Sequence, residues 1–346
     1  MSKPKHILVI RFSAMGDVAL TIPALLSVVE THPEVSITFI SRPFYASFIP
    51  SHPRIKSVGI DVDKYKGFLG IKKLANELIT EHKFDEVIDL HNVLRTRLLS
   101  SFLKLRGKKI TTFNKLRKEK KRILSQQSTE QLPHITEQYL NTFGQAGYES
   151  KLISGPWIKP EEKPQLSEFL SLNKLNSKEN KWIGIAPFAA HEAKMWGMKN
   201  IKILINELTL KGFNIFLFGG GKSEIEQLNQ LENKDKNVFS VAGKISFDQE
   251  LALMKKLDYL ISMDSSNMHF ATLIGTPVIS IWGATTPLMG FYPLNNRHLI
   301  IEVPESEKSK RTLSKYGNKA TKNGFDWRER ISEEEVLKLI NKNKKS

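Results

Sequence analysis

A single carboxylate occupies the position where an α/β protein usually places a glycine-rich phosphate-binding turn. The apolar run HILVI predicts a strand, and RFSAMGDVALTIPALLSVV (11–29) predicts a short turn followed by a helix. A dinucleotide-binding turn needs three glycines, but this turn has only Gly16, and the adjacent Asp17 would repel phosphate. The residues alone leave two interpretations of Asp17 open: a general base, or a residue that caps the helix.

Three strand ends in the C-terminal half carry residue types suited to an anion. Asp264, Ser265 and Ser266 follow the apolar run DYLISM just before a predicted helix, whose first backbone N–H groups would point at an anion. Lys194 lies in the loop AAHEAKMW, and Glu224 lies in the glycine-rich turn GGKSEIEQL, where it would accept a ribose hydroxyl. Capped helices and solvated loop lysines are common, so the three signals favour an anion site only when they are taken together.

Basic residues follow the predicted strands of the N-terminal half. DLHNVLRTR places His91, Arg95 and Arg97 just after one strand, and KYK places Lys64 and Lys66 after another. Each of them alone is compatible with an ordinary surface charge. As a set they suit an acceptor that carries phosphates and carboxylates.

The elements that must position these residues follow one pattern in both halves. Short β-branched runs alternate with amphipathic stretches, which predicts parallel strands covered by helices. Strands are expected at 6–12, 35–40, 55–60, 86–90, 108–113, 181–188, 213–219, 238–243, 258–263, 277–283 and 297–303. Helices are expected near 17–31, 71–82, 92–104, 133–147, 197–211, 223–232, 246–256, 265–275 and 332–341. The predicted linker is ESKLISGPWIKPEEKP (149–164), and the carboxyl ends of the strands are the expected binding edge.

The composition fits two ordinary globular domains. The 346 residues contain no cysteine, which excludes disulfides and thiolate metal sites, and no apolar run is long enough to span a membrane. The apolar stretch near the start is too short for a signal peptide, so the cytoplasm is the expected compartment.

The formal net charge is +16, and much of the excess lies in KLRGKKITTFNKLRKEKKR (104–122), where ten of nineteen residues are Lys or Arg. This segment fits either a solvated helix face and loop or a surface for anionic lipid. A nucleic acid partner is not favoured, because Phe113 is the only aromatic residue of the segment and stacking on bases needs more.

The motifs resemble those of the ADP-heptose:lipopolysaccharide heptosyltransferases, glycosyltransferase family 9. DSSNMHFATLIGTPVISIWGATTP (264–287) is similar to the family pattern Asp-Ser-Gly-x-Met-His-Leu-Ala, Gly-Thr-Pro-Val and Gly-x-Thr-x-Pro. SAMGDVALTIPAL is similar to Ser-x-x-Gly-Asp followed by Pro-Ala-Leu. The likeness continues in VAGKISFDQELALMKKLDYLISMD, FDEVIDLH and ISEEEVLKLI, and therefore covers nearly the whole chain.

The resemblance implies an α/β fold of the GT-B type, in which two Rossmann-like, doubly wound domains face each other across a cleft. It implies an acceptor-binding domain over residues 1–155 and a nucleotide-sugar-binding domain over 156–330. A C-terminal helix segment, 331–346, would then be free to pack back on the first domain.

The resemblance also implies roles for individual residues. Lys194 falls on the lysine that binds the diphosphate, and Asp17 falls on the catalytic base. Glu224 falls near the ribose-binding acid, and Ile245 falls on a position that packs on the base of the nucleotide. The motif at the donor site matches Asp264, Ser265, Ser266 and His269.

Two departures from the family pattern concern the phosphates. Ser266 stands where the motif has glycine, which adds a side chain beside them. Ala189 and Ala190 stand where some members have hydroxyl residues, so those contacts must be supplied elsewhere.

The reaction that the resemblance implies requires a carboxylate, and Asp17 can supply it. Glycosyl transfer passes through an oxocarbenium-like transition state, and hydrolases use two carboxyl groups for it. A nucleotide diphosphate leaves as a stable anion, so positive charge replaces the acid and one carboxylate is still needed to accept the proton of the attacking hydroxyl. With the family match, this favours the general-base interpretation.

The predicted activity is inverting transfer of a heptose from ADP-heptose to a lipopolysaccharide inner-core acceptor, without a metal or other cofactor. The enzyme is expected to be peripheral on the inner face of the cytoplasmic membrane, bound through basic residues 104–122. The alternative is a GT-B transferase with a different nucleotide sugar or a different cell-surface glycan acceptor. A Rossmann-type oxidoreductase would need the glycine turn that SAMGDV lacks.

Overall fold

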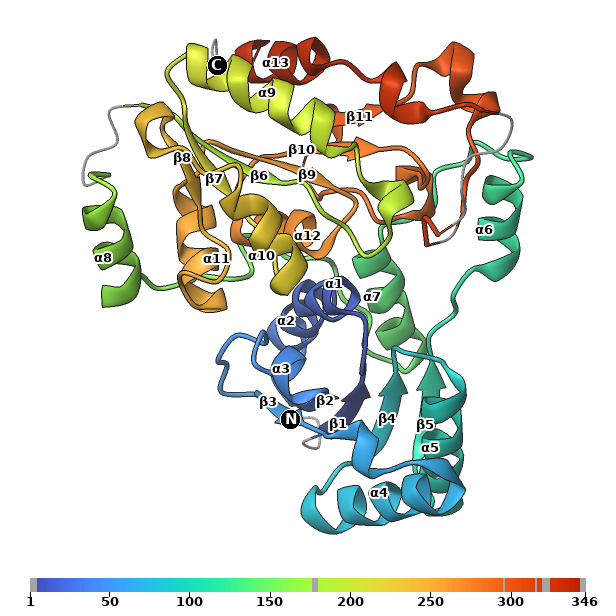
Figure 1. Cartoon of the computed structure of the whole chain (residues 1–346). Coiled ribbons are helices and arrows are strands. Elements are labelled where there is room, and N and C mark those ends of the chain that lie inside the picture. The colour runs from blue at the N-terminus through green and yellow to red at the C-terminus, as the bar shows by residue number, and fades with distance from the viewer. Residues whose placement is uncertain (1–4, 176–179, 295, 315, 319–323, 343–346) are drawn as a thin grey trace. The chain divides into compact units, whose positions relative to one another are not determined.

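The chain folds into two compact units, each built on its own parallel sheet (Figure 1). The computed structural model describes residues 5–175, 180–294, 296–314, 316–318 and 324–342. Unit 1 comprises Met1–Arg117 and Pro133–Trp157, and unit 2 comprises Lys118–Leu132 and Ile158–Ser346. The prediction of two doubly wound α/β domains is confirmed.

Unit 1 contains a five-stranded sheet in the order β3-β2-β1-β4-β5. Its strands are β1 (Lys5–Ile10), β2 (Val35–Ser41), β3 (Ile55–Gly59), β4 (Glu86–Asp89) and β5 (Lys109–Thr112). Its helices are α1 (Met15–Ala19), α2 (Ile22–Thr31), α3 (Pro43–Ala46), α4 (Gly67–Glu81), α5 (Leu94–Leu105) and α7 (Ile135–Gln145), with a 3₁₀ turn at Val62–Lys64. Leu8 and Ile10 are fully buried in one apolar cluster with Leu74 of α4 and Leu99 of α5, which explains why the central strand is a continuous apolar run.

Unit 2 contains a six-stranded sheet in the order β11-β10-β9-β6-β7-β8. Its strands are β6 (Trp182–Ala186), β7 (Asn214–Leu217), β8 (Val238–Ser240), β9 (Tyr259–Met263), β10 (Val278–Trp282) and β11 (Ile300–Glu302). Its helices are α6 (Arg117–Leu124, which begins at the last residue of unit 1), α8 (Pro164–Leu172), α9 (Met198–Leu210), α10 (Lys222–Asn229), α11 (Phe247–Lys256), α12 (Ser266–Ile274) and α13 (Glu333–Lys342). In both sheets the order of strands reverses once, between β1 and β4 in unit 1 and between β6 and β9 in unit 2. Open α/β sheets bind ligands at such a switch point.

The helix expected over 17–31 is two helices, α1 and α2, which is a correction to the prediction. Pro23 is the second residue of α2 and has no N–H to donate to the carbonyl of Ala19, so the helical hydrogen-bond pattern stops between them. As a result Asp17 lies in a short helix of its own. Helices α3, α6 and α8 were not predicted.

The domain boundary expected after residue 155 lies between Trp157 and Ile158, and residues 118–132, expected in the first domain, belong to unit 2. The C-terminal helix α13 also belongs to unit 2. Its Val336 and Ile340 are buried in the same apolar cluster as Leu204 and Leu208 of α9, so this helix completes the second core instead of returning to the first domain. Residues 343–346 of the predicted C-terminal segment lie outside the described residues. In the part of the chain that the structure describes, no helix has both the length and the hydropathy to cross a membrane.

Candidate active site

Asp17 lies in α1, directly after β1, at the carboxyl edge of the unit 1 sheet. Its carboxylate accepts a long hydrogen bond from the Ala14 N–H at 3.3 Å and forms an ion pair with Arg11 at 2.7 Å. The side chain is 26% exposed, so a hydroxyl group can still reach it. Both interpretations of Asp17 therefore have a structural basis: a contact at a helix start, and an accessible carboxylate beside a cation.

Arg11 connects the ends of the two strands between which the sheet order reverses. Its Nη2 pairs with Asp17 at the end of β1, and its Nη1 donates to the carbonyl of Leu90, just after β4, at 2.6 Å. The guanidinium is buried and lies 5.8 Å from the ring centroid of Tyr139. Arg11 therefore fixes Asp17 at the switch point of unit 1.

His91 follows β4 and lies close to this pair. Its Nε2 is 3.3 Å from the hydroxyl of Ser13, and its backbone N–H donates to Asp89 at 2.9 Å. Burial, assisted by the positive charge of Arg11, lowers the pKa of His91 to about 3. The imidazole is neutral at physiological pH, so it exchanges hydrogen bonds but does not attract a phosphate as a cation would. Its predicted role in binding the acceptor stays a prediction, and such a role would rest on hydrogen bonding and not on charge.

The other predicted acceptor residues lie along the same edge. Arg95, in the first turn of α5, donates to the carbonyl of Val62 at 3.3 Å, and Arg97 on the same helix is exposed. Lys64 ends the 3₁₀ turn after β3, and Lys66 precedes α4; both are exposed. The structure thus places two cations after β4, which adjoins β1, the strand that leads to Asp17, and two after β3, which β2 separates from β1.

In unit 2, two residues predicted to hold the diphosphate form an ion pair with each other. The Nζ of Lys194 lies 2.8 Å from Oδ2 of Asp264, and each side chain is 14% exposed. Lys194 follows β6 and Asp264 follows β9, which are hydrogen-bonded neighbours at the switch point of this sheet. Because charges that are shielded from water interact strongly, an anionic ligand has to compete with Asp264 for Lys194.

The turn that carries Lys194 is supported by the C-terminal part of the chain. The indole N–H of Trp327 donates to the carbonyl of Ala193 at 3.1 Å. Gly317 has a φ of +65°, and a Cβ at this position would lie 2.1 Å from Cγ of Lys194, so only glycine fits. The same segments line a pocket of about 330 Å³ whose walls include His191, Asp326 and Arg328.

Helix α12 begins at Ser266, next to the ion pair, and its start is open to an anion. The residue before it, Ser265, is extended, and its hydroxyl lies 3.1 Å from the hydroxyl of Ser262 instead of capping a helix N–H. The N–H groups of the first turn therefore keep no side-chain cap and suit a phosphate. His269 is buried one turn later, with its ring centroid 6.5 Å from that of Phe291.

Glu224 and Ile245 follow β7 and β8, the next strands along the same sheet. Glu224 lies in the first turn of α10 and accepts the backbone N–H of Gly220 at 2.8 Å. Burial raises the pKa of Glu224, and the bond from Gly220 opposes this shift. Ile245 is buried in the turn before α11. All residues predicted for the donor therefore lie at the carboxyl ends of the unit 2 strands or in the turns and helices that follow them.

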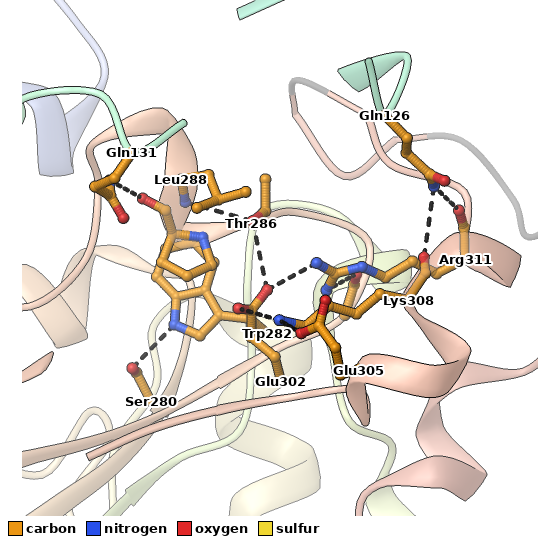
Figure 2. A network of polar contacts seen from close by, with 12 residues as sticks. Gln126, Gln131, Ser280, Trp282, Thr286, Leu288, Glu302, Glu305, Lys308 and Arg311 are labelled. Atoms are coloured by element: carbon orange, nitrogen blue, oxygen red, sulfur yellow. Dashed lines mark hydrogen bonds and ion pairs between the residues drawn. The ribbon is translucent and has the colours of Figure 1, made fainter. Parts of the chain in front are cut away.

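A polar network fixes the turn that follows β10, as Figure 2 shows. Glu302 of β11 accepts the guanidinium of the buried Arg311 at 2.7 Å and lies 3.4 Å from the hydroxyl of Thr286. Arg311 also donates to the carbonyl of Gly283 at 3.3 Å. Lys308 adds a second cation to Glu302 at 3.5 Å.

Residues 118–132 attach to the same network (Figure 2). The amide of Gln126 donates to the carbonyl of Arg311 at 3.0 Å, and the amide of Gln131 donates to the carbonyl of Pro287 at 3.0 Å. The backbone N–H of Leu132 donates to Leu288 at 2.9 Å. These bonds to backbone atoms explain why this segment is part of unit 2. Within the described residues, no three His, Asp or Glu side chains cluster closely enough to hold a metal ion.

The sequence match decides the family. The model of glycosyltransferase family 9 (heptosyltransferase) matches residues 71–343, which is most of the chain. The chain belongs to glycosyltransferase family 9. It is therefore a glycosyltransferase of the heptosyltransferase type, and both the predicted family and the predicted enzyme class are confirmed.

Individual relatives agree with this assignment of the glycosyltransferase. The lipopolysaccharide core heptosyltransferase OpsX of Haemophilus influenzae is 25% identical over 316 residues, which cover 89% of this chain and 87% of that protein. The family 9 transferase of Veillonella parvula has a TM-score of 0.77 at 22% identity, covering 99% of this chain and 98% of that one. The Escherichia coli heptosyltransferase WaaC with ADP has a TM-score of 0.69 at 18% identity, with 98% and 99% covered. These structures confirm the GT-B fold.

Three residues of the glycosyltransferase site were not predicted: Arg11, Gly317 and Trp327. Arg11 directly follows the apolar strand HILVI, and a charged residue there, six positions before an aspartate, was a signal that sequence reasoning could have used. Gly317 and Trp327 lie in a region without periodicity or motif, and only their contacts with the turn of Lys194 reveal a role.

The basic segment 104–122 of the glycosyltransferase contributes residues to both units. It is divided between the two units after Arg117. Lys120 is buried, with its Nζ 5.1 Å from the ring centroid of Phe291, and Lys108 donates to the carbonyl of Phe84 at 2.5 Å. Binding of anionic lipid by this segment stays a prediction, and it now concerns only the residues that remain exposed.

Proposed function

We propose that this enzyme transfers a heptose from ADP-heptose to the inner core of a lipopolysaccharide, with inversion at the anomeric carbon. The observation that carries the proposal is the chemistry at the two switch points. Unit 1 holds an accessible carboxylate, Asp17, and unit 2 holds a cation, Lys194, beside an uncapped helix start. Together they provide the base and the anion site that transfer from a nucleotide diphosphate needs.

The donor half of the reaction requires stabilisation of a leaving anion. As the bond between the anomeric carbon and the phosphate oxygen breaks, its electron pair stays on the diphosphate of ADP. The ammonium of Lys194 and the first N–H groups of α12 oppose that growing charge. We assign Ser265, Ser266 and His269 to contacts with the same diphosphate and with the sugar, and Asp264, which pairs with Lys194, to contacts with the sugar of the donor. Glu224 accepts a ribose hydroxyl, and Ile245 packs on the adenine.

The acceptor half requires removal of a proton. The attacking hydroxyl forms the new bond to the anomeric carbon on the face opposite the leaving ADP, so one displacement inverts the configuration. Its proton passes to Asp17, which Arg11 orients. The cations Lys64, Lys66, Arg95 and Arg97 attract the anionic groups of the acceptor. No step uses a metal ion.

The lipopolysaccharide acceptor is supported by the names of relatives, of which OpsX is a lipopolysaccharide core heptosyltransferase. The ADP donor is supported by the fold relative WaaC, whose structure contains ADP. The enzyme would then work as a peripheral protein at the inner face of the cytoplasmic membrane.

The test is a transfer assay with the purified protein and a heptose-free lipopolysaccharide acceptor. ADP-heptose, UDP-glucose and GDP-mannose are supplied in parallel, and the product is analysed by mass spectrometry and by NMR of the anomeric centre. The proposal predicts that one heptose is added from ADP-heptose and that the configuration at its anomeric carbon is inverted. The rate of transfer should be the same with and without EDTA. Equal transfer from another donor, retention of configuration, or loss of activity in EDTA would each contradict the corresponding part.

A further inference from the structure

The carboxyl edge of the unit 1 sheet exposes several large apolar side chains. Phe68 is 60% exposed, Leu69 is 76% exposed and Leu94 is 85% exposed, and all three lie at the start of a helix that follows a strand of this sheet. Phe44 in α3, after β2, is 55% exposed. Single exposed apolar residues are ordinary, but several at one sheet edge mark an interaction surface.

Side-chain contacts connect these segments to the 3₁₀ turn at 62–64 and to one another. Arg42, which precedes α3, donates to Asp63 in the 3₁₀ turn at 3.2 Å. Arg95 in α5 donates to the carbonyl of Val62 in the same turn at 3.3 Å. The ring of Phe68 in α4 packs edge-on against Phe102 of α5, with 5.0 Å between ring centroids. The residue before α3 and the start of α5 therefore both contact the turn at 62–64, and the start of α4 follows this turn directly in the chain, while Phe68 contacts α5 near its end.

Basic residues are interleaved with the apolar ones. Lys64 is 76% exposed, and Lys66 and Arg97 are also exposed. Asp61 and Asp63, the acids of the same turn, each have a basic partner, Lys64 at 3.6 Å and Arg42 at 3.2 Å. Exposed aromatic and leucine side chains among cations are typical of proteins that lie on a bilayer, where apolar groups enter the headgroup boundary and cations contact anionic lipid.

We propose that this surface, formed by Arg42, Phe44, Lys64, Lys66, Phe68, Leu69, Leu94 and Arg97, docks the enzyme on a bilayer that contains anionic lipid. The occupant is the lipid surface itself, independent of any glycan. The inference rests on the proposed function in one respect, since a lipopolysaccharide acceptor is embedded in a membrane. Docking here would place the sheet edge that carries Asp17 at the lipid surface where such an acceptor is found.

The test uses vesicles without lipopolysaccharide and without nucleotide sugar, so that it is independent of the transfer reaction. Cosedimentation is measured with phosphatidylcholine alone and with phosphatidylcholine containing phosphatidylglycerol. The test variant is Phe68→Ser/Leu69→Ser/Leu94→Ser. The matched control, Leu172→Ser/Leu210→Ser, removes leucines that are 74% and 82% exposed on unit 2. Leu94→Ser alone serves as a second test variant if the triple variant does not fold.

The wild type and the control are expected to bind the anionic vesicles and to bind phosphatidylcholine weakly. The triple variant should lose about tenfold or more of its vesicle affinity, and Leu94→Ser a smaller part of it, because each apolar group that enters the boundary contributes to binding. Activity on a soluble, delipidated acceptor should be unchanged in both variants. A third variant, K118Q/K121Q/R122Q, tests the basic segment in the same assay.

Four results would overturn the proposal. The triple variant could bind as well as the wild type, or the control could lose as much affinity as the triple variant. Alternatively, wild-type binding could require lipopolysaccharide in the vesicle, which would make this edge an acceptor site only. A large loss in the basic-segment variant alone would assign docking to residues 118–122 instead.

Discussion

The guanidinium of Arg11 lies 2.7 Å from the carboxylate of Asp17 while its other amino group donates to Leu90 at the end of the neighbouring strand. Burial acts to lower the pKa of Arg11, but the charge and hydrogen bond of Asp17 together with Tyr139 and Asp89 outweigh it, and the net shift is upward. Arg11 therefore stays charged wherever the protein is folded. It holds the carboxylate at the switch point and favours its ionised form.

Removing this cation should change the pH dependence of the reaction. Arg11→Met is expected to lower turnover by about tenfold or more and to shift the acidic limb of the profile of kcat/KM to higher pH, because a carboxylate without its cation is easier to protonate. Arg11→Lys should restore part of the rate and of the profile. A lower rate with an unmoved acidic limb would show that Arg11 serves the fold only.

Because Lys194 and Asp264 form an ion pair, we expect substitutions of the two residues to have opposite effects on ADP affinity. Lys194→Met should weaken ADP binding and reduce turnover by about 10²-fold, which is typical of losing one electrostatic donor. Asp264→Asn removes the carboxylate that competes for Lys194, so ADP should bind as tightly as to the wild type or more tightly. Isothermal titration calorimetry with ADP measures both. Equal weakening by the two substitutions would mean that Asp264 helps to bind the diphosphate instead of competing with it.

Glu250 in α11 should make the protein less stable as the pH rises. Burial raises the pKa of this side chain to about 8 from an ordinary value of 4.5, so the folded protein keeps a proton that the unfolded chain releases. The free energy of unfolding therefore falls between about pH 4.5 and pH 8. Glu250→Gln should have little effect at pH 5 and should stabilise the protein by on the order of 2–4 kcal/mol at pH 8.5.

Urea unfolding of both proteins at the two pH values checks this prediction. The exposed Glu168 of α8 gives a matched control, and Glu168→Gln should change the free energy of unfolding little at either pH. A gain from Glu250→Gln that is the same at both pH values would show that burial of charge is not the cause.

Every predicted strand is present, and the central strands, such as β1 and β10, were predictable because strands buried on both faces are nearly continuous apolar runs. The sequence was also sufficient to place the predicted site residues at strand ends. It was not sufficient for the pairing of Lys194 with Asp264, because the two residues are brought together by the adjacency of β6 and β9, which are far apart in the chain.

Other features depended on contacts that local patterns do not encode. Residues 118–132 have the composition of a solvated basic stretch, yet hydrogen bonds from Gln126 and Gln131 to backbone carbonyls attach them to unit 2. Helix α13 was predicted as an element, but its position on α9 depends on the buried faces of both helices. The ion pair of Arg11 with Asp17 joins residues six apart and could have been predicted, but its bond to Leu90 depends on the pairing of β1 with β4.

The most direct test of the account is the turnover of Asp17→Asn, measured at saturating ADP-heptose and acceptor and compared with the wild type. Asparagine keeps the shape of the side chain, can still contact the start of α1 and accept from Arg11, but cannot take a proton from a hydroxyl. Some loss of stability is expected because Arg11 is buried. ADP affinity, which the proposed function assigns to unit 2, is therefore the control. The account predicts a loss of about 10² to 10⁴ in turnover with ADP affinity unchanged. Retention of more than roughly a tenth of the wild-type rate would contradict it and leave Asp17 as a residue that begins a helix.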